Sequence, residues 1–169
     1  MEPDEPDQQI RFHINVECDD GKPDIARLEA LARTVCKKFH APRAVVDVAI
    51  VADDQFRCLN RRFRGSDSTS DCLSFDLSDQ TEANVARIFQ IVLNAQKAVR
   101  EAKRRGHTAE SELALYLTHG LLHNLGFDDR TQSQANAMHR AEDEILQQLG
   151  YGLVYNRQPE ENDFEDEED

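Results

Sequence analysis

The sequence predicts a mixed α+β domain in which helices pack on a sheet, and three observations favour this class. Stretches that alternate apolar and polar residues, the pattern of half-buried strands, are interspersed with longer stretches of helical period. The chain has 169 residues, about the length of one domain, and contains no internal repeat. Its 39% hydrophobic and 31% charged residues are typical of a globular protein, and no apolar stretch approaches the ~20 residues that span a membrane.

The negative charge of the chain lies at its two ends. The formal net charge is −13, yet residues 1–9 carry four acidic residues, residues 158–169 carry eight, and neither segment has a basic residue. Residues 10–157 hold 21 acidic and 20 basic residues, so a basic surface on the domain is compatible with the overall charge. We therefore expect one folded domain over 10–157 between two disordered acidic tails. The acidic N-terminus does not resemble a secretory signal, which indicates the cytoplasm.

The first part of the chain predicts two strands and two helices in alternation. Residues 10–17 alternate apolar and polar side chains, and the β-branched stretch 44–52 predicts a second strand. A helix is expected between them over residues 23–39, and Asp53 is expected to cap a short helix over 53–62. The apolar stripe of the longer helix consists of Ile25, Leu28, Leu31, Ala32, Val35 and Phe39.

The second part of the chain predicts two more strands and three helices. After a polar segment over 65–71 without helical period, strands are expected over 72–75 and 85–93. Each helix that follows is bounded by a residue that starts or stops helices. These helices are a basic one over 95–105 that stops at Gly106, one capped by Thr108 that runs to Leu125 before Gly126, and one capped by Thr131 that ends at Gly150.

A pair of histidines on the Leu-rich helix predicts a metal site. His119 and His123 are four residues apart, which places both imidazoles on one helix face and suits two ligands of one ion. Gly126 allows the chain to reverse, and the reversal brings Asp128 or Asp129 towards the same ion. Two imidazoles and one carboxylate leave coordination positions open, as a catalytic metal requires. The alternative is a pair of neutral, hydrogen-bonded core histidines.

The residue after the first histidine excludes one class of enzyme. Zinc proteases with two histidines at this spacing carry a glutamate there, which acts as the general base. Gly120 occupies that position in this chain. A protease of that type is therefore not expected.

Two basic clusters suggest a ligand that carries phosphate. Arginine suits phosphate because its planar guanidinium donates two parallel hydrogen bonds. If both clusters flank the histidines they form a positive groove suited to phosphodiester cleavage, whereas the alternative is two solvated helix faces. The strand expected over 72–75 can present its edge to an extended ligand. The clusters are Arg57, Arg61, Arg62 and Arg64 in the first and Lys97, Arg100, Lys103, Arg104 and Arg105 in the second.

Residues 59–76 and 119–129 together resemble the YbeY family, bacterial metal-dependent endoribonucleases of ribosomal RNA maturation. The resemblance extends over about residues 10–152 and includes the closing segment 141–151. The matching residues are Leu59, Asn60, Arg64, Gly65, Asp67, Asp71, Leu73, Ser74 and Phe75 in the first motif and His119, Gly120, Leu122, His123, Gly126 and Asp128 in the second.

The resemblance implies a zincin-like fold with a mixed four-stranded sheet and the metal-site helix beside it. It implies one zinc ion per chain bound by His119 and His123, and catalytic roles for His119 and for Arg64, which would bind the scissile phosphate. The implied activity is cleavage of single-stranded RNA in 3′-end maturation of small-subunit ribosomal RNA and in ribosome quality control. The implied partners are the small ribosomal subunit and a ribosomal protein or GTPase, with no DNA and no membrane.

The chain departs from the family at the third metal ligand, where the family has histidine and this chain has Asp129. Aspartate is shorter, adds negative charge and makes a harder ligand set, so activity is expected to be weaker and Mn, Fe or Ni become alternatives to zinc. Asp128 competes for the position and His139 is a more distant substitute. The function alternatives are a non-catalytic RNA-binding or ribosome-binding module with a degenerate metal site, or a metal-dependent hydrolase of another substrate.

Overall fold

The structure of the protein, a computed structural model, describes residues 9–18, 20–65, 72–78 and 86–152. The predicted acidic tails lie outside these ranges except for Gln9, as does the segment with Asp67 and Asp71. Within the described ranges, five helices and four strands follow one another in the expected order, so the predicted α+β class is confirmed. The domain limits at residues 10 and 157 stay predictions.

The strands form one mixed sheet in the order β1-β2-β4-β3. β1, β2 and β4 run parallel, while β3 pairs antiparallel with β4 and forms one edge of the sheet. β1 and β2 alternate more buried with less buried residues, as their period-2 patterns predict. The bounds of the strands are Ile10–Val16 for β1, Ala44–Val51 for β2, Cys72–Asp76 for β3 and Arg87–Asn94 for β4.

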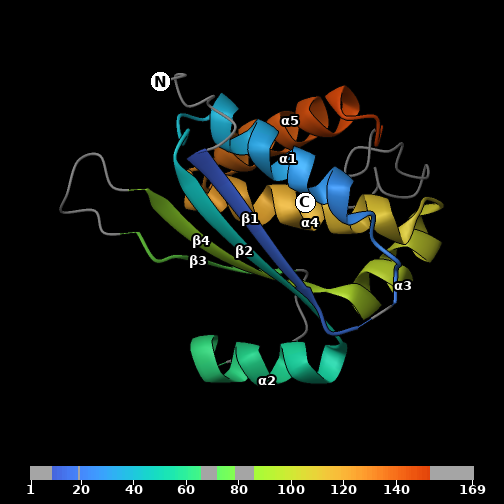
Figure 1. The fold of residues 1–169 in the computed structure, drawn as a ribbon. Coiled ribbons are helices and arrows are strands. Elements are labelled where there is room, and N and C mark those ends of the chain that lie inside the picture. The colour runs from blue at the N-terminus through green and yellow to red at the C-terminus, as the bar shows by residue number, and fades with distance from the viewer. Residues whose placement is uncertain (1–8, 19, 66–71, 79–85, 153–169) are drawn as a thin grey trace.

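Helices cover both faces of the sheet (Figure 1). α1 (Ile25–Lys38), α4 (Ala109–Asn124) and α5 (Gln132–Gln148) lie together on one face, and α2 (Asp53–Arg64) lies on the other. α3 (Ala95–Arg105) follows β4 directly and packs against α4 beyond the end of the sheet. None of the described helices combines the length and the apolar character needed to cross a bilayer.

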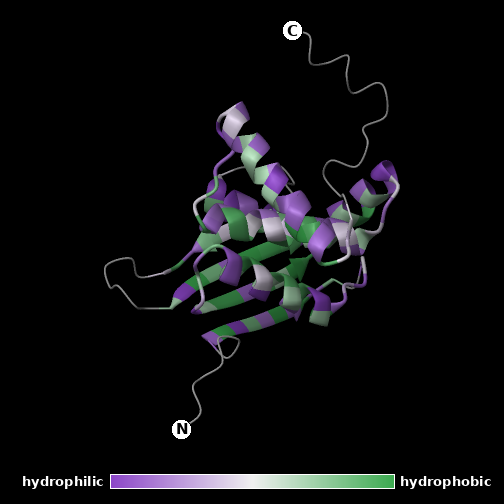
Figure 2. Cartoon of the chain, turned by 90° about the horizontal axis from the view of Figure 1, so that it is seen from above, coloured by the Kyte–Doolittle hydropathy of each residue, from purple (hydrophilic) through white to green (hydrophobic). Residues whose placement is uncertain are grey.

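The helix that carries His119 and His123, α4, lies at the centre of the helical layer. Leu113, Leu117 and Leu121 are fully buried, and the core lies between this helix, its neighbouring helices and the sheet. Figure 2 shows apolar residues concentrated on the strands, whereas the outer helices carry polar residues along their length. A Cβ at Gly120 would lie 3.1 Å from Cδ1 of Ile91, so α4 approaches β4 at this glycine. A side chain at this position would require the Ile91 side chain to shift, and the close approach sets the two histidines beside the sheet.

The caps predicted at Thr108 and Thr131 are present, since each side chain accepts a hydrogen bond from the backbone three residues on. Two other local predictions are wrong. Asp53 does not cap α2, because Ala52 holds that position and the Asp53 carboxylate pairs with Arg100 instead. Ile25, predicted on the buried stripe of α1, is 45% exposed because it lies in the first turn, before the helix reaches the core.

Candidate metal centre

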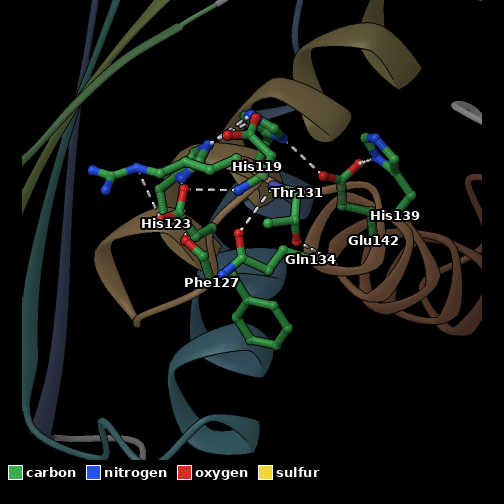
Figure 3. Close-up of polar contacts among 10 residues, drawn as sticks. His119, His123, Phe127, Thr131, Gln134, His139 and Glu142 are labelled. Carbon is green, nitrogen blue, oxygen red and sulfur yellow. Dashed lines mark hydrogen bonds and ion pairs between the residues drawn. The ribbon is translucent and has the colours of Figure 1, made fainter.

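His119 and His123 lie one turn apart on α4 and point towards each other (Figure 3). Their ring centroids are 4.5 Å apart with the ring planes at 84°, and the two Nε2 atoms are 3.0 Å apart. Both rings are partly exposed although most of the helix around them is buried. The structure therefore brings the two rings together, as their spacing predicts.

The remaining ring nitrogens of both histidines are held by acceptors. Nδ1 of His119 lies 2.8 Å from Oε1 of Glu142, and Nδ1 of His123 lies 3.2 Å from the carbonyl oxygen of Phe127. Neither an ionised carboxylate nor a carbonyl can donate, so each Nδ1 carries the proton and donates it. Each Nε2 then presents a lone pair, and the two lone pairs face a common point. This is the arrangement in which histidines bind metals in proteins.

The turn after α4 supplies the third donor. Gly126 has a φ of +105°, and the N–H of Phe127 donates to the carbonyl of Leu122 at 2.9 Å, so the chain reverses as predicted. Oδ2 of Asp129 comes within 3.7 Å of Nε2 of His123. Of the two aspartates left open by the sequence, Asp129 is therefore the one that reaches the histidines.

The neighbouring aspartate has other contacts. Oδ2 of Asp128 pairs with Nε of Arg130 at 3.2 Å, and Oδ1 accepts the backbone N–H of Asp129 at 2.8 Å. Asp128 therefore shapes the turn. The same turn is anchored to α1, since the ring of Phe127 meets that of Phe39 edge to face with centroids 5.1 Å apart.

The three donors fit a divalent metal ion. One ligand atom from each of His119, His123 and Asp129 lies within 4.8 Å of the others. Two nitrogen ligands at the usual distance from a tetrahedral zinc ion are about 3.3 Å apart, close to the 3.0 Å between the two Nε2 atoms. Facing lone pairs repel each other unless a cation lies between them. Two imidazoles and one carboxylate suit zinc and also leave coordination positions open.

A buried carboxylate on α5, that of Glu142, links His119 of the donor group to His139. Oε1 of Glu142 contacts His119 and its Oε2 lies 3.3 Å from Nδ1 of His139 (Figure 3). Burial raises the pKa of Glu142, but the hydrogen bonds from His119 and His139 lower it more, so this pKa lies below its ordinary value. Glu142 is therefore ionised at neutral pH and orients His119. His139, the substitute ligand considered from the sequence, contacts Glu142 and does not belong to the donor group.

The donor group opens into a cavity of about 450 Å³ that also contains Arg64. Arg64 is the last residue of α2 and precedes Gly65, which has a φ of +68° and ends the helix. Its side chain thus reaches the cavity from the helix on the opposite face of the sheet, next to edge strand β3. The cavity is lined by Arg64, Cys72, Ser74, His119, His123, Asn124 and Asp129.

The other basic residues predicted to bind RNA are not all at this cavity. Lys97 and Arg104 line a second cavity of about 300 Å³, which shares His119 with the first and borders Glu142. Arg100 pairs with Asp53, and Lys103 is exposed on α3. The remaining three, Arg57, Arg61 and Arg62, are exposed on α2.

Sequence reasoning missed Glu142 and the carbonyl of Phe127. Glu142 is buried between Met138 and Ile145 on the apolar stripe of α5, and a carboxylate on such a stripe is a signal that it has a charged or hydrogen-bonded partner. The Phe127 carbonyl gives no such signal, because every residue carries one.

The chain is similar to proteins named Endoribonuclease YbeY. The family model with that description matches residues 13–150. A protein of that name from Caldanaerobacter subterraneus subsp. tengcongensis is 32% identical over 145 residues, 76% of this chain and 92% of the relative. Another, from Carboxydothermus hydrogenoformans, is 36% identical over 106 residues, 63% of this chain and 73% of the relative. The solution structure of TM1509 from Thermotoga maritima, at 23% identity, aligns with a TM-score of 0.55 over 82% of this chain and 90% of that chain, so the two proteins share a fold.

Proposed function

Because the chain belongs to the YbeY family, we propose that it is a metal-dependent endoribonuclease that cleaves single-stranded ribosomal RNA. The observation that carries the proposal is the meeting of the donor group with Arg64 in one open cavity. A divalent metal site beside an arginine suits a reaction in which negative charge accumulates on phosphate oxygens.

Zinc is the ion that we propose for the site, with His119, His123 and Asp129 as its ligands. When bound, the ion supplies Lewis acidity and activates water as a nucleophile at neutral pH. Asp129 is 46% exposed and is the only acidic donor in the group, so Mn, Fe or Ni are the alternatives for this harder ligand set. The negative charge of Asp129 also reduces Lewis acidity, and we expect a slower enzyme than one with three histidines.

The side chains at the cavity have separate roles in the proposed reaction. Glu142 keeps the proton on Nδ1 of His119, so the Nε2 lone pair of this catalytic histidine stays directed into the cavity. The guanidinium of Arg64 donates hydrogen bonds to the scissile phosphate and stabilises the charge that develops on it. Glu142 is engaged by two histidines and is not available to take a proton from water.

The proposed substrate is the 3′ end of small-subunit ribosomal RNA, in the cytoplasm. The small ribosomal subunit would present this RNA, and a ribosomal protein or a GTPase would help to deliver it. Processing and quality control of the ribosome both follow from such an activity. The exposed arginines of α2 and the basic residues of α3 would contact the RNA backbone.

The direct test is cleavage of a single-stranded oligoribonucleotide by zinc-loaded protein. We expect a chelator to stop cleavage and added zinc to restore it. We expect His123→Ala to abolish the restoration, whereas His13→Ala, which changes an exposed histidine of β1, leaves it intact. Cleavage that persists in the chelated protein or in the His123→Ala variant would refute the proposed role of the metal.

A second function is favoured by one observation, the replacement of the family's third histidine by a half-exposed aspartate. In that case the chain is a non-catalytic RNA-binding module whose metal site has degenerated. A protein that binds RNA, contains no metal and does not cleave RNA would support the module. An Asp129→His variant that gains both metal and cleavage would identify the native site as a weakened form of the family's site.

A further inference from the structure

We propose that Phe63, the residue before Arg64 on α2, is a stacking platform for one base of the RNA that enters the metal-site cavity. The inference rests on the proposed function and adds to it a binding residue that recognises an unpaired base. It follows from the exposure of this ring, from its neighbours and from the charge of the helix that carries it.

The exposure of Phe63 is unusual for its residue type. Among the described residues, the exposed large hydrophobic side chains are those of Ile25, Phe63 and Leu77, and Phe63 is the aromatic one, with 56% of its surface exposed. The other two lie at the start of α1 and just after β3. An aromatic ring in water loses the stabilisation that burial gives, and on this polar helix face the ring of Phe63 is available to a ligand.

The contacts of the ring leave it open to stacking. Phe75 of β3 meets Phe63 at an interplanar angle of 62°, with the ring centroids 5.3 Å apart. Phe75 therefore supports the ring at a steep angle and does not stack flat on it. The guanidinium carbon of Arg62 lies over the ring, 5.5 Å from its centroid, too far for flat contact. Arginine also stacks on bases, so a planar base can stack on Phe63 together with Arg62.

The charge around Phe63 identifies the ligand as a polyanion. The last turn of α2 carries Arg61, Arg62 and Arg64, and no ion pair between described residues involves Arg62 or Arg64. An aromatic ring within a basic surface is the combination by which proteins bind single-stranded nucleic acid without reading its sequence. The next residue, Arg64, lines the cavity at His119 and His123 although Phe63 does not, so one RNA strand would contact Phe63 and Arg64 in succession.

This arrangement favours single-stranded over double-stranded RNA. In a duplex, each base is already stacked between its neighbours and paired, so its face is not available to a side chain. In a single strand, a base can turn onto Phe63 at little cost. The preference for single strands would thus come from α2, on the other face of the sheet from His119 and His123, and would not require the metal.

The absence of tryptophan from the sequence gives a direct optical test. A Phe63→Trp variant contains one tryptophan at the proposed platform. We add a chelator, which prevents cleavage, and expect the fluorescence to be quenched by a single-stranded oligoribonucleotide and to be unchanged with the corresponding duplex. The matched control is Ile25→Trp, which places the single tryptophan on α1, on the opposite face of the sheet, and should not respond.

Binding measurements on two further variants test the same inference without a new fluorophore. We expect Phe63→Leu to bind the single strand about tenfold more weakly than the native protein. We expect Phe63→Tyr to bind within about twofold of the native protein, because tyrosine also stacks. If Phe63→Leu binds as tightly as the native protein, or if Phe63→Trp shows no quenching, the platform does not exist.

The two proposals fail in different ways. If the zinc-loaded native protein does not cleave RNA but Phe63→Trp is quenched, the stacking inference stands and the nuclease activity is refuted. If the native protein cleaves RNA while Phe63→Trp and Phe63→Leu behave like their controls, the nuclease stands and the platform is refuted.

Discussion

The helices α2 and α3 are alike in sequence and differ in what surrounds their basic residues. Both are short, both carry three basic residues in their last turn, and both end at a glycine with a positive φ, Gly65 and Gly106. On α3, Arg104 lies 2.6 Å from Glu101, and Arg105 lies near both Glu101 and Glu112.

The last turn of α2 has no comparable acidic partners for Arg62 and Arg64 within the described residues. Of the two acidic residues in the first turn of α2, Asp53 and Asp54, the first forms an ion pair with Arg100 of α3. The basic residues of α3 thus have acidic partners close by, and among the described residues Arg62 and Arg64 of α2 do not. We therefore expect α2 to contribute more to RNA binding and cleavage than α3.

The largest expected difference between the two helices is in the cleavage rate, which should fall far more in Arg64→Ala than in Arg104→Ala. Loss of a donor that stabilises charge in the transition state typically lowers the rate by about 10²- to 10³-fold, and we expect this for Arg64. Arg104→Ala should change the rate by no more than about threefold, the range of a surface ion pair. Single-turnover cleavage rates with zinc-loaded protein measure both. Equal losses in the two variants would show that the two helices act alike.

The salt dependence of RNA binding shows how many phosphate contacts α2 and α3 each make. Each phosphate contact to a single strand contributes about 0.7 to the slope of log affinity against log salt concentration. We expect Arg61→Gln with Arg62→Gln to reduce this slope by about 1.4 if each arginine makes one contact. The paired change on α3, Lys103→Gln with Arg104→Gln, should reduce the slope by less, because Arg104 is already paired with Glu101. A larger reduction from the α3 pair would reverse the proposed order.

The ion pair between Asp53 of α2 and Arg100 of α3 should contribute to the free energy of unfolding in a pH-dependent way. The hydrogen bond from Arg100 lowers the pKa of Asp53 below its ordinary value, with a smaller contribution from Asn94. A lowered pKa in the folded state stabilises the protein at neutral pH, and this contribution is lost as the pH falls below about 3.9, the ordinary aspartate value, through the lowered pKa.

Arg100→Ala should therefore cost about 0.5–1 kcal/mol of unfolding free energy at pH 7, since Arg100 is partly solvated. Urea unfolding of the native protein and of this variant at pH 7 and at pH 3 measures the change. The difference between the two proteins should shrink at pH 3. A difference that grows at low pH would contradict the assigned ion pair.

The smallest effect should come from Glu101→Gln, which removes the carboxylate nearest to Arg104 and Arg105. Stability should fall by a few tenths of a kcal/mol, as for other helix-surface pairs. Affinity for RNA should rise by no more than about threefold as α3 comes to resemble α2. Titration of the oligoribonucleotide against both proteins tests this, and an unchanged or lower affinity would show that counter-charge does not distinguish the helices.

Much of the fold was predictable from local pattern. The strands at Ile10–Val16 and Ala44–Val51 follow from alternation, and the capped starts of α4 and α5 follow from Thr108 and Thr131. The Asp53 cap was predicted wrongly because a side chain more than 40 residues away offers a charged partner that local sequence does not reveal.

The candidate site likewise has features that the local sequence predicts and others that only the fold determines. The i,i+4 spacing of His119 and His123 and the turn at Gly126 are local features, and the sequence contains them. The choice of Asp129 over Asp128 depends on where the turn places each carboxylate, and the link from His119 to Glu142 joins two helices. Such contacts across the fold require coordinates.

The most direct test of the central claim, that one divalent ion is held by two histidines and Asp129, is a count of metal per chain after zinc loading and dialysis. We predict about one zinc ion for the native protein and for Asp128→Asn, which keeps the turn's hydrogen-bond acceptor, and a ratio well below one for Asp129→Asn. Equal zinc content in the two variants, or a native protein that retains no ion, would contradict the claim.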